Sequence, residues 1–198
     1  MDIASFIIYC VIVTFTPGPT NVVILSAAQN SGMKKAMEYS YGATLAFAIL
    51  LAISAVLNTV LVAVIPPILL IMQVVGTIYI LYLAYQIYHM DSAGESEMQV
   101  ATFRSGVIMQ FVNPKVVLFT MTVIPSFVMP YYTTPYFLTI FVAIITVIGF
   151  LAFATWVLFG AMFKEFLQRH QKLVNVSMSF FLVYSAVVGS GLLELIRR

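Results

Sequence analysis

Two short stretches interrupt apolar runs of the sequence and hold most of its chemically useful groups. The first, "TPGPTN", contains Pro17, Gly18, Pro19, Thr20 and Asn21. Proline lacks a backbone N–H and clashes with the carbonyl of residue i−4, so it breaks or kinks a helix. We expect this break to free the carbonyls of Val13 and Phe15. The helix that resumes beyond it begins with N–H groups, around residues 20–22, that lack acceptors.

The second stretch, "FVNPK", contains Asn113, Pro114 and Lys115. Pro114 is expected to free the carbonyl of Gln110, and the N–H groups of residues 115–117 to lack acceptors. Free carbonyls suit an ammonium group, and the positive end of a helix suits a carboxylate. The asparagine amides serve either group. Together these groups match what a zwitterionic amino acid requires.

Lys115 is the least expected residue, because it lies about ten positions inside an apolar run. A basic residue there costs about 2.5–3.5 kcal/mol and by default marks a functional site. Its ammonium either pairs with a substrate carboxylate or snorkels to the cytoplasmic headgroups. For the prolines, the alternative to a binding site is a kink that only shapes how the helices pack. Two kinks at matching positions favour a binding site, with the eight residues named above as candidates.

The composition places the chain in a membrane. It has 198 residues, of which 62% are hydrophobic and 8% charged, whereas soluble domains have about 25% charged residues. Crossing about 30 Å of hydrocarbon takes roughly 20 apolar residues. Six runs meet that length: residues 3–28, 41–65, 68–88, 105–129, 137–163 and 173–195. We therefore predict an all-α integral membrane protein of six transmembrane helices, with helices 1 and 4 broken.

Tight turns and a polar linker separate these runs. Pro66-Pro67 and the stretch "PYYTTPY" (130–136) predict two uncharged turns. The linker at 91–104 divides one transporter domain, 1–198, into two halves, 1–90 and 105–198. Lysine and arginine in short loops mark the cytoplasmic side. Six basic residues follow runs 1, 3 and 5, and two end the chain: Lys34, Lys35, Arg104, Lys164, Arg169 and Lys172, against Arg197 and Arg198. The linker is therefore expected in the cytoplasm and both termini outside.

Three runs in each half make the halves inverted repeats, an architecture of secondary transporters. At 1.5 Å per residue, Pro17 lies roughly 20 Å from the outer end of its run and Pro114 roughly 14 Å from the inner end of its own. Both breaks then fall between the midplane and the inner third of the membrane. Interrupted helices at corresponding positions are the best sequence pointer to a transporter's binding site.

Other functional classes lack the residues they need. The sequence has no HExxH, no GxSxG and no cysteine–histidine metal spacing, so neither an enzyme nor a metal site nor a cofactor is expected. It has no glycine-rich phosphate loop for ATP. The net charge of +2 arises from too few residues for nucleic acid. A passive small-solute channel and a non-transporting assembly protein remain alternatives. The expected partners are an amino-acid substrate and membrane lipid, and homodimer formation is left open.

At "TPGPTN" and "FVNPK" the chain resembles the LysE/RhtB family of bacterial inner-membrane amino-acid exporters, and within it the cysteine and O-acetylserine efflux branch. The resemblance covers the length, the six segments, the linker and both motifs. It implies efflux of small amino acids or their derivatives by alternating access, driven by the proton gradient or membrane potential. No Asp or Glu lies deep in any segment, so the sequence shows no carboxylate relay for protons.

Overall fold

The computed structural model describes residues 2–89 and 101–189, apart from the side chains of residues 58–73 and 188–189. Most of the expected linker therefore lies outside the described residues. Within those two ranges the protein is helical and has no strand. The elements are α1 (Ile3–Phe15), α2 (Pro19–Asn30), α3 (Met33–Tyr88), α4 (Phe103–Val112), α5 (Pro114–Val123), the π-helix η1 (Ile124–Val128), α6 (Pro135–Met162), α7 (Lys164–Arg169) and α8 (Gln171–Gly189).

Both predicted helix breaks are present in the structure. α1 and α2 are bent by 52° where they meet, and α4 is bent by 69° against α5 and η1. Thr16 ends α1 in an extended conformation, with φ −60° and ψ 137°, and Asn113 ends α4 with φ −83° and ψ 107°. Each precedes a proline, whose ring disfavours the helical region for the residue before it. Proline therefore determines where each span breaks.

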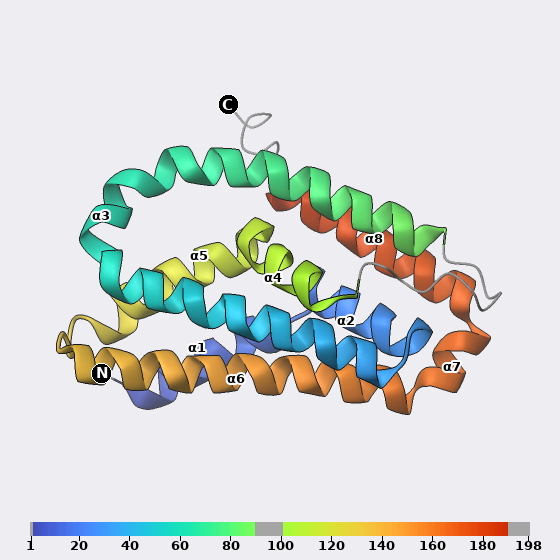
Figure 1. Cartoon of the computed structure of the whole chain (residues 1–198), viewed down its shortest axis with the longest axis horizontal. Helices are drawn as coiled ribbons and strands as arrows, with labels where there is room; N and C mark the ends of the chain where they lie inside the picture. The colour runs from blue at the N-terminus through green and yellow to red at the C-terminus, as the bar shows by residue number, and fades with distance from the viewer. Residues whose placement is uncertain (1, 90–100, 190–198) are drawn as a thin grey trace.

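The prediction of a turn at Pro66-Pro67 is wrong. Both prolines lie within helical backbone of α3, and the one residue with non-helical dihedrals is Leu57, at φ −102° and ψ 16°. Figure 1 shows α3 reversing its direction between a first arm, Met33–Leu57, and a second arm, Val74–Tyr88. The fixed φ of proline is compatible with a helix, so the dipeptide alone does not locate the reversal. The turn expected at 130–136 is confirmed between η1 and α6.

The described helices fit a membrane protein. Two of them, the first arm of α3 and α6, are long and apolar enough to span a bilayer. Each bent pair adds a span if it counts as one, and the second arm of α3 is apolar but shorter. The prediction of six spans in two inverted repeats goes further than these residues test.

α4 and α5 lie between the two arms of α3, and α8 runs beside the second arm (Figure 1). Two glycines bring α3 and the second broken span into backbone contact. A Cβ on Gly106 would lie 2.2 Å from the carbonyl oxygen of Tyr39, and one on Gly76 would lie 2.0 Å from that of Val112. Any larger residue would push the helices apart. Gly76 thereby fixes α3 against the residue just before the second break.

Most of the described basic residues gather at one end of the molecule. The end of α2, the start of α3, α7 and the start of α8 lie at the right of Figure 1, and the N-terminus and the η1–α6 turn at the left. α7 is a short helix within the segment expected to be a loop. The right-hand end carries Lys34, Lys35, Lys164, Arg169 and Lys172.

Candidate substrate-binding site

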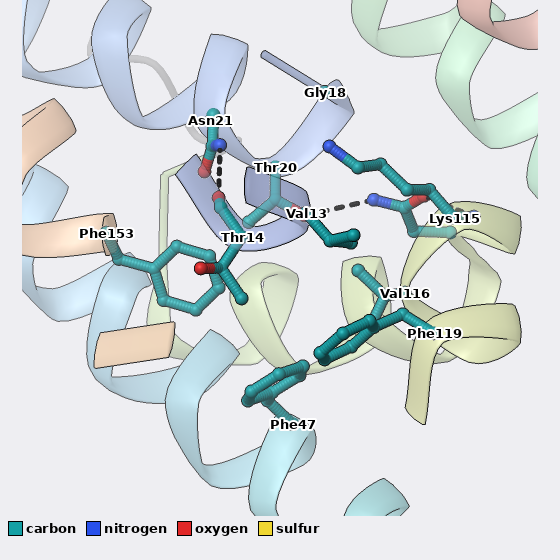
Figure 2. A pocket seen from close by; sticks show the side chains of 11 residues that line it. Val13, Thr14, Gly18, Thr20, Asn21, Phe47, Lys115, Val116, Phe119 and Phe153 are labelled. Carbon is teal, nitrogen blue, oxygen red and sulfur yellow. Dashed lines mark hydrogen bonds between the residues drawn. The ribbon is translucent and has the colours of Figure 1, made fainter. Parts of the chain in front are cut away.

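One cavity lies between the two helix breaks, and residues from both breaks line it (Figure 2). Its volume is about 30 Å³, which is room for one or two water molecules rather than an amino acid. The lining residues are Val13, Thr14, Gly18, Thr20, Asn21, Phe47, Asn113, Lys115, Val116, Phe119 and Phe153. Five of the eight candidates from the sequence therefore share this cavity. Pro17, Pro19 and Pro114 lie beside it at the breaks.

At the first break, side chains donate hydrogen bonds to carbonyls at the end of α1 and at Thr16. Asn21 Nδ2 donates to the carbonyl oxygens of Thr14, at 3.1 Å, and Thr16, at 3.0 Å. Trp156 Nε1 of α6 donates to the carbonyl of Phe15 at 3.3 Å. Buried carbonyls need such partners because water does not reach them in a membrane. The amide of Asn21 thus holds the end of α1 against the start of α2.

At the second break, one residue accepts from the first backbone N–H groups of α5. Asn113 Oδ1 accepts from the backbone N–H of Lys115 at 3.1 Å, and its carbonyl accepts from Val116 and Val117, each at 3.1 Å. The prediction that residues 115–117 lack acceptors is therefore wrong. Asparagine is among the strongest N-cap residues, and its side chain closes the turn it begins. The positive end of α5 is occupied by its own cap.

The start of α2 differs, because its N-cap is Gly18, which has no side chain and makes no capping hydrogen bond. The N–H of Val22 bonds to the Gly18 carbonyl at 2.9 Å, so the expectation of free N–H groups fails for that residue. Pro19 has no N–H. Nothing in the described ranges caps the N–H groups of Thr20 and Asn21, and an uncapped helix start attracts anions.

Two side-chain contacts join the breaks to each other. Thr20 Oγ1 accepts from Gln110 Nε2 at 3.2 Å and from Asn113 Nδ2 at 3.1 Å. Lys115 Nζ donates to the carbonyl of Thr16 at 2.9 Å and to that of Pro17 at 3.4 Å. The ammonium of the second break is thus bonded to the backbone of the first.

Lys115 also lies directly across Gly18. A Cβ on Gly18 would be 3.3 Å from both Cδ and Nζ of Lys115. An ammonium has three N–H donors, and two of them point to backbone carbonyls here. The remaining donor and the uncapped start of α2 place two positive groups at one point of the cavity wall.

Two buried amide oxygens near the breaks lack a partner among the described residues, that of Asn21, which lines the cavity, and that of Gln110, which does not. Asn21 Oδ1 and Gln110 Oε1 have no hydrogen-bond partner within the described part of the chain. Asn21 is 3% exposed and Gln110 0%. An unsatisfied buried acceptor calls for an explanation, and a ligand that donates hydrogen bonds is one. An ammonium is such a ligand.

The opposite wall of the cavity is aromatic. Phe47 of α3, Phe119 of α5 and Phe153 of α6 close it, and each is at most 5% exposed (Figure 2). Among the described residues, no acidic side chain lines the cavity. The described residues also contain no group of three or more His, Cys, Asp or Glu side chains able to hold a metal ion.

Sequence reasoning missed several of these residues. Gln110 had a signal, since it is a polar residue in an apolar run, three positions before Asn113. Trp156, the single tryptophan of the chain, and Phe47 look like any other apolar residue of a membrane helix. Only the packing of distant segments brings them to the breaks.

Comparison with protein families matches residues 11–193 to the family described as LysE type translocator. A cysteine/O-acetylserine efflux protein of Klebsiella pneumoniae is 31% identical over 186 residues, which are 93% of this chain and 95% of the relative. Proteins of the same name from Salmonella typhimurium and Escherichia coli K12 are 29% and 26% identical, over 94% and 93% of this chain and 96% and 95% of the relatives. No solved structure matches.

Proposed function

The chain belongs to the LysE type translocator family, and we propose that it exports small amino acids or their derivatives, of the cysteine and O-acetylserine class, from the cytoplasm. The similarity to efflux proteins extends over more than nine-tenths of both chains. The apolar helices support a location in the inner membrane.

The observation that carries the proposal is the convergence of unused donors and acceptors at one cavity. The uncapped start of α2 and the Lys115 ammonium suit a carboxylate. The unpartnered Asn21 Oδ1 suits an ammonium. A passive channel has no need for a central site with both kinds of group, and an assembly protein has no need for paired breaks that face each other.

We infer that Pro17, Gly18 and Pro19 shape the first half of this site and Pro114 the second, whereas Thr20, Asn21, Asn113 and Lys115 supply the polar contacts. In this conformation the cavity is too small for an amino acid. Substrate binding therefore requires the Lys115 side chain, which is long and only half-buried, to move. The small volume supports a transporter that changes conformation rather than a permanently open pore.

The proposed mechanism is alternating access between two inverted three-helix repeats, with six spans and both termini outside. The basic residues at one end of the molecule support this orientation. The contacts of Thr20 and Lys115 cross from one repeat to the other. Breaking them on one side of the cavity would open that side, and remaking them would close it.

The test is efflux from proteoliposomes that contain the purified protein and one labelled amino acid at a time. We expect saturable export of L-cysteine and O-acetyl-L-serine, with counterflow when unlabelled substrate is added outside. Lys115→Met should abolish it, and Lys172→Met, a change at an exposed lysine of α8, should not. Non-saturable flux without counterflow would establish the channel instead. Absence of flux for every amino acid tested would refute transport.

A further inference from the structure

The aromatic wall of the cavity is built so that Phe47 has little freedom to move. Its ring stacks on that of Phe119, with centroids 6.0 Å apart and planes 5° from parallel. It meets Phe153 edge-on at 6.4 Å. Phe47 is 2% exposed. Side chains packed this closely in a core do not yield to a ligand without a cost in free energy.

The ring of Phe47 packs against α6 at Gly149, on the side of the ring away from the cavity. A Cβ at this position would lie 2.6 Å from Cε1 and 2.9 Å from Cδ1 of Phe47. Real Cβ atoms do not approach that closely, so only glycine leaves room for the ring where it stands. Any side chain at position 149 would displace Phe47 away from α6.

The two walls of the cavity therefore differ in how they respond to a ligand. The polar wall is adaptable, because Lys115 is a long side chain that swings aside at little steric cost. The aromatic wall is rigid and comes from three different helices, α3, α5 and α6. An amino acid held by its ammonium and carboxylate at the polar wall has to direct its side chain toward the phenylalanines.

We propose that Phe47, held in place by Gly149, sets the upper size limit of the exported amino acid's side chain. Uncharged side chains no larger than that of O-acetylserine fit against the ring, and bulkier aromatic ones do not. Basic side chains are excluded as well, because no acidic residue in the described part of the chain lines the cavity, which already contains the Lys115 ammonium. This inference rests on the proposed export function, which it refines by naming the residue that limits the substrate.

The experiment measures two substrates in the same vesicles. Proteoliposomes are loaded with labelled L-serine and labelled L-phenylalanine together, and the ratio of their initial efflux rates is recorded. This ratio does not depend on how much protein is inserted. One methylene in an apolar pocket changes discrimination by about tenfold or more, so Phe47→Ala should shift the ratio toward phenylalanine by at least that factor. Phe47→Leu, which keeps most of the bulk, should fold even if alanine does not, and should shift the ratio less.

Substitution of Gly149 provides a second part of the experiment. Gly149→Ala should slow serine efflux in the wild-type background, because the added Cβ displaces the ring. In a Phe47→Ala background the same change should have little further effect, because no ring remains to be displaced. The matched control is Phe180→Ala on α8, whose ring is 73% exposed, and its ratio should equal that of wild type.

An unchanged ratio in Phe47→Ala and Phe47→Leu, in protein that still exports serine, would overturn the size limit and leave the export function intact. Equal acceleration of both substrates would also overturn it, since it would make Phe47 a gate rather than a filter. Failure of the wild-type protein to export serine, cysteine or O-acetylserine would refute the proposed function itself.

Discussion

The two helix breaks look alike in sequence but are built differently. The first leaves Thr16, Pro17 and Gly18 outside the helices, whereas the second leaves only Asn113. The second break is capped by its own residue, which accepts three backbone N–H groups. The carbonyls of the first break are held by side chains from elsewhere, as distant in sequence as Lys115 and Trp156.

The difference indicates where the ligand chemistry resides. The N–H groups of the second break are already capped and leave few donors for a ligand, and Val112 beside this break packs directly on Gly76 of α3. A break held by movable side chains retains uncapped N–H groups and an unpartnered acceptor, Asn21 Oδ1. We infer that the backbone of the second break is a fixed support that carries the Lys115 side chain, and that the backbone of the first break is the half that binds and moves.

Lys115 should produce the largest effect, because it is the charged link between the breaks. Each hydrogen bond to a charged group contributes about 1.5–3 kcal/mol, so loss of two should lower the efflux rate at least about 100-fold. We expect this for Lys115→Met, measured as initial rate per amount of protein in the membrane. Lys115→Arg should retain little activity, since the planar fork does not replace a compact ammonium in a small cavity. Wild-type activity in Lys115→Met would remove Lys115 from the site and favour the snorkelling alternative.

Asn21 should come next. Asn21→Ala leaves the Thr14 carbonyl without its donor and removes the proposed ammonium acceptor, at about 1–3 kcal/mol, or roughly tenfold in efflux. Membrane abundance should stay near wild type. Gln168→Ala serves as control, because this exposed amide donates to the Gln29 carbonyl far from the cavity. Equal losses in the two variants would show that the effect is general destabilisation.

Substitutions of Asn113 distinguish a role in supporting the second break from a role in binding the substrate. Asn113→Ala should lower the thermal unfolding midpoint, because loss of an N-cap costs about 0.5–2 kcal/mol, and should reduce efflux by less than Asn21→Ala does. Asn113→Ser restores a capping oxygen but not the Nδ2 donor to Thr20, so it should recover most of the stability. If serine is no better than alanine, the cap is not what fixes the second break.

Trp156 should give the smallest effect. Trp156→Phe keeps an aromatic ring and removes only the donor to the Phe15 carbonyl, which at 3.3 Å is a long hydrogen bond. A contribution near 0.5 kcal/mol corresponds to about a twofold fall in efflux. A loss as large as that of Lys115→Met would mean that α6, rather than the second broken span, is the main partner of the first break.

Local signals in the sequence predicted much of the fold. The prolines predicted the position of both breaks because the effect of proline on the helix is local: its ring and missing N–H disturb the backbone of neighbouring residues whatever the tertiary structure. Apolar runs predicted an all-helical membrane protein because their length and composition are also local properties of the sequence. Pro66-Pro67 misled because a helix accommodates proline when its surroundings allow it, and the reversal of α3 depends on tertiary packing.

The candidate site was predictable only in part. Asn21, Asn113 and Lys115 stand out as polar residues in apolar runs, and the structure brings them to one cavity. Their partners do not stand out, since the bonds of Trp156 to Phe15 and of Lys115 to Thr16 join residues 141 and 99 positions apart. The N-cap role of Asn113 was readable from its place before Pro114, and expecting free N–H groups there overlooked it.

The most direct test of a substrate site at the first break is protection of a cysteine placed in the cavity. The single native cysteine, Cys10, is replaced by alanine, and Thr14→Cys introduces a thiol at the cavity wall. O-acetyl-L-serine should slow the reaction of this thiol with N-ethylmaleimide several-fold in the active variant. It should not do so once Lys115→Met is added, nor at Phe180→Cys on the exposed face of α8. An unprotected thiol at position 14, in protein that still exports O-acetyl-L-serine, would place the substrate elsewhere and contradict the account.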